Sequence, residues 1–294
     1  MSGASADYIP ARAPAEQLLR TDSSALASAL HISLPEARRE VQMLLTRAGQ
    51  VDLATLLAYP ERAAQAYANP AYSQTLARRL NGEPMAYVLG EREFYGLVFE
   101  VSPAVLIPRP ETELLVELAL ERLAAHSAAA VLDLGTGSGC IAVALAKLRP
   151  AARIVASDVS PEALAVARSN ARRHGITNIA FRAGSWFEAA AGERFDLIIS
   201  NPPYVSRGDA HLTHGDLRFE PGIALTAGAS GLEALQAIIG DAPRHLLAGG
   251  SLLVEHGYGQ GEAVAQLLRS AGLVDVIARD DLAGIARTAG GRRP

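Results

Sequence analysis

Apolar residues follow two different spacings along this chain of 294 residues. Up to about residue 82 they recur every three or four positions, which is the period of helices that bury one face. From about residue 130 onward, short continuous apolar runs alternate with helical stretches, as in a parallel sheet covered by helices. The pattern predicts a helical domain over residues 1–82, a linker over 83–110 and an α/β domain over 111–294.

Helix-start signals divide the first domain. After a frayed start (residues 1–13), a first helix is expected to begin at Pro14. Ser33, with Glu36 three positions later, predicts a capping box for a second helix. Asp52 predicts the cap of a short helix that Pro60 ends or restarts, and another helix is expected over Pro70–Leu80. We expect this bundle to dock a macromolecular partner; the alternative is a folded appendage without a binding role.

Short apolar runs in the second domain predict its buried strands. They are Ala130–Leu134, Arg153–Ser157, Asn178–Arg182, Phe195–Ser200 and Ser251–Glu255. Helices are expected near residues 112–124, 139–149, 161–174, 230–248 and 259–271. An antiparallel pair, Leu273–Ala278 with Ile285–Ala289, is expected to close the sheet, and the aromatic run Glu93–Val101 predicts a hairpin in the linker.

The stretch Ser200-Asn201-Pro202-Pro203-Tyr204 ends the fourth of these strands. Each proline fixes φ at about −65° and has no N–H, so the turn is stiff and presents carbonyl oxygens at the carboxyl edge of the sheet. The Asn201 side-chain oxygen and the Pro202 backbone carbonyl could each accept a hydrogen from a planar –NH2 group. Tyr204 could lie flat against the same group. The alternative is a proline-rich turn that only ends a strand.

A glycine-rich loop, Asp133-Leu134-Gly135-Thr136-Gly137-Ser138-Gly139, follows the first strand. Its glycines allow a tight turn and a close approach of backbone to ligand. A dinucleotide-binding loop would place its third glycine at the position of Cys140, and a P-loop would continue with Gly-Lys-Ser/Thr. The spacing instead resembles the loop of class I methyltransferases, which use S-adenosylmethionine.

Two further residues end strands at positions suited to that cofactor. Asp158 follows the glycine loop by about 20 residues, where a carboxylate can accept the two ribose hydroxyls. Asp158 could instead cap the next helix, but Ser160, directly before a proline, is the better cap. Trp186 follows the third strand and is expected to stack on adenine; its alternative role is core packing.

Other reactive residue types have ordinary interpretations. Cys140 is expected to be a small packed residue rather than a nucleophile, and His256 a structural residue rather than a base. Arg109 and Glu111 either form an ion pair at a helix start or line the active site.

Composition restricts the function classes. A formal net charge of −4 argues against a dedicated DNA-binding domain, so no nucleic-acid partner is expected. The single cysteine excludes an internal disulfide and fits the cytoplasm. The sequence shows no signal peptide, no apolar run of about 20 residues that would span a membrane, and no metal-ligand cluster.

The chain from about Glu83 to Gly291 resembles the bacterial protein-(glutamine-N5) methyltransferases of peptide chain release factors, the HemK/PrmC family. Besides the glycine loop and Asn-Pro-Pro-Tyr, the resemblance rests on Phe94-Tyr95-Gly96, Leu106-Ile107-Pro108-Arg109-Pro110-Glu111-Thr112-Glu113, Phe219-Glu220-Pro221 and Asp281-Leu282-Ala283-Gly284. The Arg-Pro-Glu-Thr-Glu sequence favours this family over the similar enzyme that acts on a ribosomal protein glutamine, which usually carries Arg-Ser-Pro there.

The resemblance implies a class I methyltransferase domain with a Rossmann-like sheet, and methyl transfer from S-adenosylmethionine to the glutamine of the Gly-Gly-Gln motif of class I release factors. It assigns to the cofactor Gly135, Thr136, Gly137, Ser138, Gly139, Asp158, Trp186 and Asn201. It assigns to the substrate glutamine Asn201, Pro202, Pro203 and Tyr204, of which Asn201, Pro202 and Tyr204 are the expected catalytic residues. Ser185 departs from the family, which often has Asp there, so this chain has no carboxylate at that position to contact adenine.

Three other functions are weighed against this one. A DNA N6-adenine methyltransferase uses the same turn, but it would flip a base and hold phosphates with a basic surface, which the acidic balance opposes. A glutamine methyltransferase acting on a ribosomal protein remains a second alternative. A binding protein with a relic cofactor fold is opposed by the intact motifs.

Overall fold

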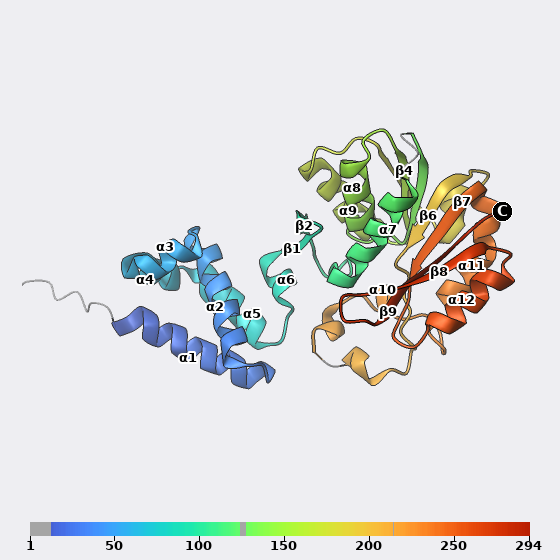
Figure 1. The fold of residues 1–294 in the computed structure, drawn as a ribbon. Coiled ribbons are helices and arrows are strands. Elements are labelled where there is room, and N and C mark those ends of the chain that lie inside the picture. Colours follow the sequence, from blue (N-terminus) through green and yellow to red (C-terminus); the bar gives the residue numbers. More distant parts are fainter. Residues whose placement is uncertain (1–12, 124–127, 214) are drawn as a thin grey trace, which may run out of the picture. The chain divides into compact units, whose positions relative to one another are not determined.

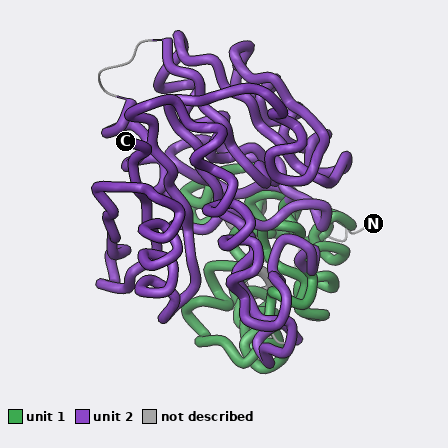
Figure 2. Tube along the Cα trace, turned by 90° about the vertical axis from the view of Figure 1, so that its right-hand side faces the viewer, with its two compact units in different colours: residues 1–89, 214–219 green, residues 90–213, 220–294 purple. Residues whose placement is uncertain are grey.

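The computed structural model describes residues 13–123, 128–213 and 215–294. The expected frayed start therefore lies almost entirely outside the described residues. The chain forms two compact units, coloured green and purple in Figure 2. Unit 1 takes in residues 1–89 and 214–219, and unit 2 takes in residues 90–213 and 220–294. The division falls a few residues beyond the expected boundary at 82, and no sequence signal predicts that a segment near residue 215 belongs with the helices.

Unit 1 is helical, as the spacing predicts. Its helices are α1 (Ala13–Leu30), α2 (Leu34–Gly49), α3 (Leu53–Ala58), α4 (Pro60–Ala68), α5 (Pro70–Leu80) and α6 (Met85–Leu89), with a 3-10 turn, η4 (Gly215–Phe219) (Figure 1). The Ser33 hydroxyl accepts the Glu36 N–H at 3.3 Å, and the Asp52 carboxylate accepts the Thr55 N–H at 2.6 Å. These caps confirm the predicted starts of α2 and α3; α6 was not predicted.

The predicted hairpin is formed by β1 (Glu91–Phe94) and β2 (Leu97–Glu100). Tyr95 and Gly96 join the strands with φ of 51° and 71°, the left-handed pair of a tight two-residue turn. Phe94 and Phe99 are fully buried in the core that also contains α7 and α8 residues. The hairpin thus packs within unit 2.

A mixed sheet forms the centre of unit 2. Among the described residues it has seven strands in the order β5-β4-β3-β6-β7-β9-β8. The strands are β3 (Ala130–Leu134), β4 (Arg153–Asp158), β5 (Ile179–Ala183), β6 (Phe195–Ser200), β7 (Leu246–Glu255), β8 (Val274–Asp280) and β9 (Ala286–Arg292). Strands β3 to β7 pair in parallel, and β9 pairs antiparallel with both β7 and β8. This confirms the predicted Rossmann-like sheet and its closing antiparallel pair.

Helices cover both faces of the sheet. They are α7 (Glu113–Arg122), α8 (Cys140–Leu148), α9 (Pro161–Arg173), α11 (Glu233–His245) and α12 (Gly261–Ser270), with a short α10 (Gly222–Leu225) (Figure 1). Alternate residues of each central strand pack in two separate cores: Val131 lies with α7 and α8, whereas Leu132 lies with α11 and α12. This burial on both faces explains why the strands are continuous apolar runs.

One boundary differs clearly from the prediction. The helix expected near 230–248 ends at His245, and β7 begins at Leu246 rather than at Ser251. Leu246 is fully buried and pairs with Phe195, after which the register shifts before Leu197 meets Ser251. Gly249 and Gly250 interrupt the apolar run within this irregular stretch, so the run of apolar residues marks only the later part of the strand.

Candidate active site

The parallel strands place the predicted residues along one edge of the sheet. Across β4, β3, β6 and β7 the register aligns Ser157, Leu134, Ser200 and Val254. The next residue along the chain is in each case at the carboxyl end of its strand: Asp158, Gly135, Asn201 and Glu255. From β3 the chain forms β4 and then β5 on one side, and afterwards crosses back to form β6 on the other side of β3, so the strand order reverses between β3 and β6. This is the switch point at which open α/β sheets bind ligands.

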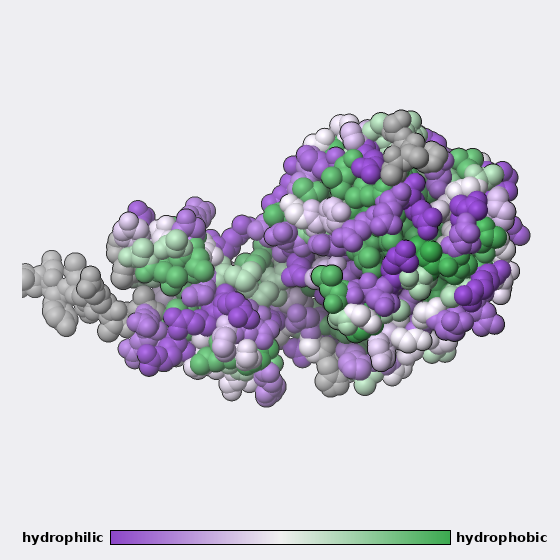
Figure 3. Space-filling view, viewed as in Figure 1, coloured by the Kyte–Doolittle hydropathy of each residue, from purple (hydrophilic) through white to green (hydrophobic). Residues whose placement is uncertain are grey.

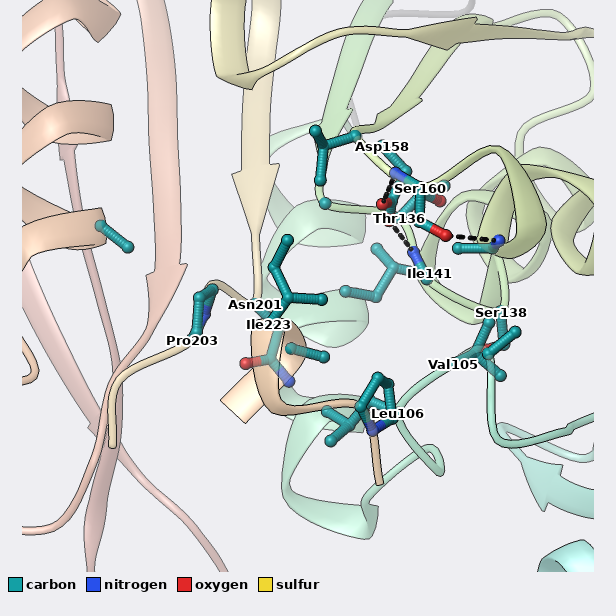
Figure 4. A pocket seen from close by; sticks show the side chains of 18 of the residues that line it. Val105, Leu106, Thr136, Ser138, Ile141, Asp158, Ser160, Asn201, Pro203 and Ile223 are labelled. Carbon is teal, nitrogen blue, oxygen red and sulfur yellow. Dashed lines mark hydrogen bonds between the residues drawn. The ribbon is translucent and has the colours of Figure 1, made fainter. Parts of the chain in front are cut away.

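A cavity of about 460 Å³ opens at this edge, within the size range of small-molecule sites. Of the predicted residues, those that line it are Gly135, Thr136, Gly137, Ser138, Asp158, Trp186, Asn201 and Pro203. Gly139, Pro202 and Tyr204 are not among the lining residues. In the view of Figure 4, Asp158 and Thr136 lie on one side of the cavity and Asn201 and Pro203 on the other.

The glycine loop needs glycine for two different reasons. Gly135, Gly137 and Gly139 have φ of 69°, 55° and 80°, in the left-handed region that side chains disfavour. A Cβ on Gly139 would also lie 3.2 Å from the Cα of Ala167, so this glycine lets α9 approach the loop. By contrast, a Cβ on Gly137 would meet nothing within 4 Å, which leaves that side of the loop open.

Asp158 ties the loop to the next strand. One carboxylate oxygen accepts the Gly137 N–H and the other accepts the Ser160 N–H, both at 2.9 Å. Ser160 caps α9 through the Ala163 N–H at 3.1 Å, as predicted. A carboxylate has about four acceptor positions, so Asp158 retains capacity to accept hydroxyl groups of a ligand.

Trp186 forms part of the cavity wall from a strained position. Its φ is 45°, which is unusual for a bulky residue. Ser185 and Glu188 form a reciprocal capping box around it, and the Ser185 N–H donates to the Glu188 carboxylate at 3.0 Å. Ser185 therefore caps the short 3-10 helix η2 (Trp186–Ala190). Strain held by such contacts is typical of binding sites.

Asp133 is a buried acid beneath the loop. One carboxylate oxygen accepts the Thr136 hydroxyl at 2.6 Å, and the other has no partner among the described residues. Burial raises the pKa of Asp133 from 3.8 to about 7. Asp133 was expected in the glycine loop but not among the site residues.

The side-chain amide of Asn201 is hydrogen-bonded at its nitrogen, while its oxygen is available. Its side-chain nitrogen donates to the Thr112 hydroxyl at 3.0 Å, and the Thr112 hydroxyl donates to the Glu255 carboxylate at 2.7 Å. Among the described residues, no donor is bonded to the Asn201 side-chain oxygen or to the Pro202 carbonyl. These two acceptors are therefore available to a ligand. Thr112 also lines the cavity, a role that the sequence analysis missed.

Tyr204 is held at both its ends. Its hydroxyl donates to Glu255 at 3.1 Å, and its backbone carbonyl accepts from the Gln260 side chain at 3.1 Å. Burial, with the nearby Glu255 carboxylate, raises the pKa of the Tyr204 hydroxyl. The end of the Asn-Pro-Pro-Tyr turn is thus fixed by the last residue of β7 and by Gln260 after it, neither of which was predicted to take part.

Arg109 lines the cavity and forms an ion pair with Glu220, not with the neighbouring Glu111. The Glu220 side chain is fully buried and also accepts the Ile107 N–H at 3.0 Å. The ion pair joins the Arg-Pro-Glu-Thr-Glu segment to Phe-Glu-Pro, two motifs that the sequence separates by about a hundred positions. Each of the two motifs contributes a residue to the cavity lining, Arg109 from the first and Pro221 from the second.

Cys140 and His256 are buried, as their ordinary interpretations predict. Burial raises the pKa of the Cys140 thiol to about 12, which keeps it protonated and unreactive at neutral pH. The His256 ring is hydrogen-bonded to the Gly257 carbonyl at 3.0 Å. Within residues 13–123, 128–213 and 215–294, we find no group of three or more candidate ligands that could hold a metal ion. Nor does any helix in these ranges have the length and apolar character to cross a membrane.

Comparisons with known proteins identify the family. Residues 17–90 match the model of the PrmC N-terminal domain, and residues 125–273 match that of a methyltransferase domain. The release factor glutamine methyltransferase of Bordetella pertussis is 52% identical over 86% of this chain and 94% of its own length. The chain belongs to the release factor glutamine methyltransferase family. A member from Xylella fastidiosa is 48% identical over 87% of this chain and 94% of its own length.

Solved structures support the fold of this methyltransferase. The catalytic domain of hMettl16, in complex with an RNA hairpin, aligns with a TM-score of 0.55 at 17% identity, over 74% of this chain and 81% of that one. Despite the low identity, the class I methyltransferase fold is shared.

The residues at the edge fit S-adenosylmethionine, the cofactor of this enzyme class. The open glycine loop would receive its methionine part, Asp158 has acceptors left for ribose hydroxyls, and Trp186 offers a ring face. These groups are a carboxylate, backbone N–H and C=O groups and an aromatic wall, which suit a charged nucleoside.

Proposed function

We propose that this protein transfers a methyl group from S-adenosylmethionine to the side-chain amide nitrogen of the glutamine in the Gly-Gly-Gln motif of class I peptide chain release factors. The relatives that carry this name support the reaction class. The observation that carries the proposal is the pair of free acceptors at Asn201 and Pro202 beside the cavity. We propose the cytoplasm, where release factors act, as its compartment.

The two acceptors suit the amide nitrogen of glutamine. That nitrogen is a poor nucleophile because its lone pair is delocalised into the carbonyl group. Hydrogen bonds from its two N–H groups to the Asn201 side-chain oxygen and the Pro202 carbonyl would fix its orientation. Holding a reactant in line with its partner contributes on the order of several kcal/mol.

S-adenosylmethionine, when bound, supplies a methyl group on a positively charged sulfur. The Asn201 and Pro202 oxygens carry partial negative charge, so they would stabilise the positive charge that develops on the glutamine nitrogen. No general base is required from the chain, because an N-methylated amide is strongly acidic while it is cationic. The ring of Tyr204, fixed at its hydroxyl by Glu255, would support the glutamine side chain.

We propose that unit 1 docks the release factor. Its helix α3 exposes Leu53 and Leu57, and Tyr59 directly after α3 is 55% exposed. Figure 3 shows apolar residues gathered over this part of unit 1 on the face in view. Such a surface suits contact with another protein better than contact with a small molecule.

The test is methyl transfer from labelled S-adenosylmethionine to a purified class I release factor, followed by peptide mass mapping. We expect one added methyl group on the glutamine of Gly-Gly-Gln. A release factor in which that glutamine is replaced by glutamate is the matched control and should remain unlabelled.

The competing substrates are tested in the same assay. Label on DNA would favour adenine methylation, and label on a ribosomal protein would favour the other glutamine methyltransferase. Either result, without label on the release factor, would overturn the proposed substrate while leaving the methyl transfer itself in place.

A further inference from the structure

We propose that Glu255 and Thr112 are positioning residues, which fix the direction in which the Asn201 side-chain amide faces. The inference rests on the proposed glutamine methylation, because it concerns the group that would hold the glutamine nitrogen. Neither residue is among those assigned to the methyl donor. Their role is to ensure that Asn201 presents oxygen, not nitrogen, to the cavity.

The Glu255 carboxylate is buried, so protein donors rather than water must satisfy its oxygens. It is the last residue of β7 and is 1% exposed. One carboxylate oxygen accepts the Thr112 hydroxyl at 2.7 Å, and the other accepts the Tyr204 hydroxyl at 3.1 Å. When ionised, a buried carboxylate has only acceptors and requires such donors, so the two hydroxyl hydrogens point toward it.

The hydroxyl of Thr112 then has only one way to meet Asn201. A threonine hydroxyl carries a single hydrogen, and this hydrogen is used on Glu255. What remains on the Thr112 oxygen is acceptor capacity, which only a donor can satisfy. The –NH2 end of the Asn201 amide, 3.0 Å away, is that donor.

The direction of one amide follows from this sequence of bonds. The two ends of an asparagine amide have nearly the same shape, so hydrogen bonds decide which end faces where. With its nitrogen on Thr112, Asn201 turns its oxygen away from Thr112, ready to accept an N–H. If the amide were reversed, its –NH2 group would face the –NH2 group of the substrate glutamine, and two donors would oppose each other.

The network joins distant motifs. Thr112 belongs to Arg-Pro-Glu-Thr-Glu, directly before α7, whereas Glu255 lies 143 positions later in the chain. The β6–β7 register brings Glu255 to the same edge as Asn201. The Glu255 carboxylate thereby fixes the orientation of the Asn201 amide, through Thr112, and the position of the Tyr204 hydroxyl, by direct contact.

The experiment compares Thr112→Val with Thr112→Ser in the full-length enzyme, at a pH well above the pKa of about 7 that burial gives Glu255, so that this residue is ionised. Valine keeps the shape of threonine but removes both hydrogen bonds, so Asn201 can reverse. We expect kcat for release factor methylation to fall about 10- to 100-fold, whereas KM for the release factor and Kd for S-adenosylmethionine change less than about threefold. Serine keeps the hydroxyl and should recover most of the lost kcat.

Thr288→Val is the matched control. Thr288 is also fully buried and pairs with Glu255 in the β7–β9 register, but its hydroxyl has no partner among the described residues. The same substitution there should leave kcat near the wild-type value. Equal losses at both positions would mean that the effect is general packing, and the proposal would be overturned.

Two further results would also overturn it: a Thr112→Val enzyme with kcat within threefold of wild type, or one that changes only in KM. Should Thr112→Val not fold, Glu255→Gln decides. Glutamine can donate to Thr112 and so release its hydroxyl hydrogen toward Asn201. A lowered kcat at unchanged KM supports the proposal, and a wild-type kcat contradicts it. A wild-type enzyme that leaves the release factor unlabelled is a different outcome, because it overturns the proposed function and this inference with it.

Discussion

Asn201 is the residue on which the proposed chemistry depends most directly. Within the Asn-Pro-Pro-Tyr turn its free oxygen is the one side-chain acceptor at the cavity, because Pro203, the other turn residue that lines it, has none. Asn201→Ala is therefore expected to lower kcat by about two to three orders of magnitude, similar to the loss of one electrostatic contact in other active sites. The Kd for S-adenosylmethionine, measured by titration calorimetry, should change little. Turnover close to that of wild type would refute the role assigned to Asn201.

Glu255 also leads to a prediction about stability and pH. Burial raises its pKa from 4.5 to about 7 in the folded chain. As the pH rises from about 4.5 to about 7, the unfolded chain loses this proton first, so the free energy of unfolding decreases over that window. One pKa unit corresponds to about 1.4 kcal/mol, so the decrease attributable to Glu255 is roughly 3 kcal/mol.

Glu255→Gln should remove this decrease. Denaturant unfolding at several pH values, followed by the fluorescence of Trp186 in unit 2, measures the difference between variant and wild type. The comparison is necessary because other groups titrate nearby. Asp133 acts in the same direction, whereas burial lowers the pKa of His256 and destabilises the fold as the pH falls below about 6.5. Parallel pH profiles for the two proteins would show that Glu255 ionises normally in the fold.

At the scale of elements, the glycine loop and α9 depend on each other. Gly139→Ala would place a Cβ in the left-handed region and 3.1–3.2 Å from Ala167 atoms. We expect it to reduce the free energy of unfolding by about 2–4 kcal/mol, from the backbone conformation and the forced repacking together. S-adenosylmethionine binding should weaken as well, because the loop must move.

Gly175→Ala separates these two effects. Gly175 has a φ of 67°, but a Cβ there would meet nothing within 4 Å. It should therefore lose only about 1–2 kcal/mol, without any change in cofactor affinity. Equal losses for the two variants, measured by denaturant unfolding, would mean that the contact with α9 contributes nothing.

The elements that the sequence predicts well are those with strong local signals. Strands β3 and β6 are buried on both faces, so continuous apolar runs mark them at both ends. The caps at Ser33, Asp52 and Ser160 are also local, because a cap and its partner lie three residues apart. The helix α6 and the start of β7 lack such signals.

The site was predicted only in part for a related reason. The glycine loop, Asp158 and Asn201 each end a strand, and topology alone brings them together. The bond from Thr112 to Glu255 and the ion pair of Arg109 with Glu220 join residues more than 100 positions apart. Such contacts arise only in the folded chain and leave no local signal in the sequence. An acid that ends a strand beside Asn-Pro-Pro-Tyr was the one available signal for Glu255.

At the scale of the whole molecule, Arg79 holds unit 1 together. Its buried guanidinium donates to both Glu40 oxygens at 2.8 and 3.0 Å and also bonds Asp216, in the segment that unit 1 takes from late in the chain. Arg79→Met would leave the mostly buried Glu40 carboxylate unpaired, and we expect a loss of about 3 kcal/mol in the unfolding of unit 1.

The control is Arg244→Met, which breaks an ion pair with Asp241 on an exposed face of α11. Exposed pairs contribute about 1 kcal/mol or less, so this variant should unfold like wild type. Thermal unfolding followed by helical circular dichroism measures both. A loss no larger for Arg79→Met than for Arg244→Met would show that Arg79 is replaceable.

Because residues 215–219 group with residues up to 89, the helical unit is discontinuous in the gene. A recombination event that moved only the first 89 codons to another methyltransferase would leave behind the η4 turn, and Arg79 would arrive without Asp216. Moving the catalytic part alone would carry an η4 segment adapted to helices that are no longer present. The two units therefore have to be inherited, exchanged and engineered as a pair, even though a single boundary near residue 90 makes them look separable.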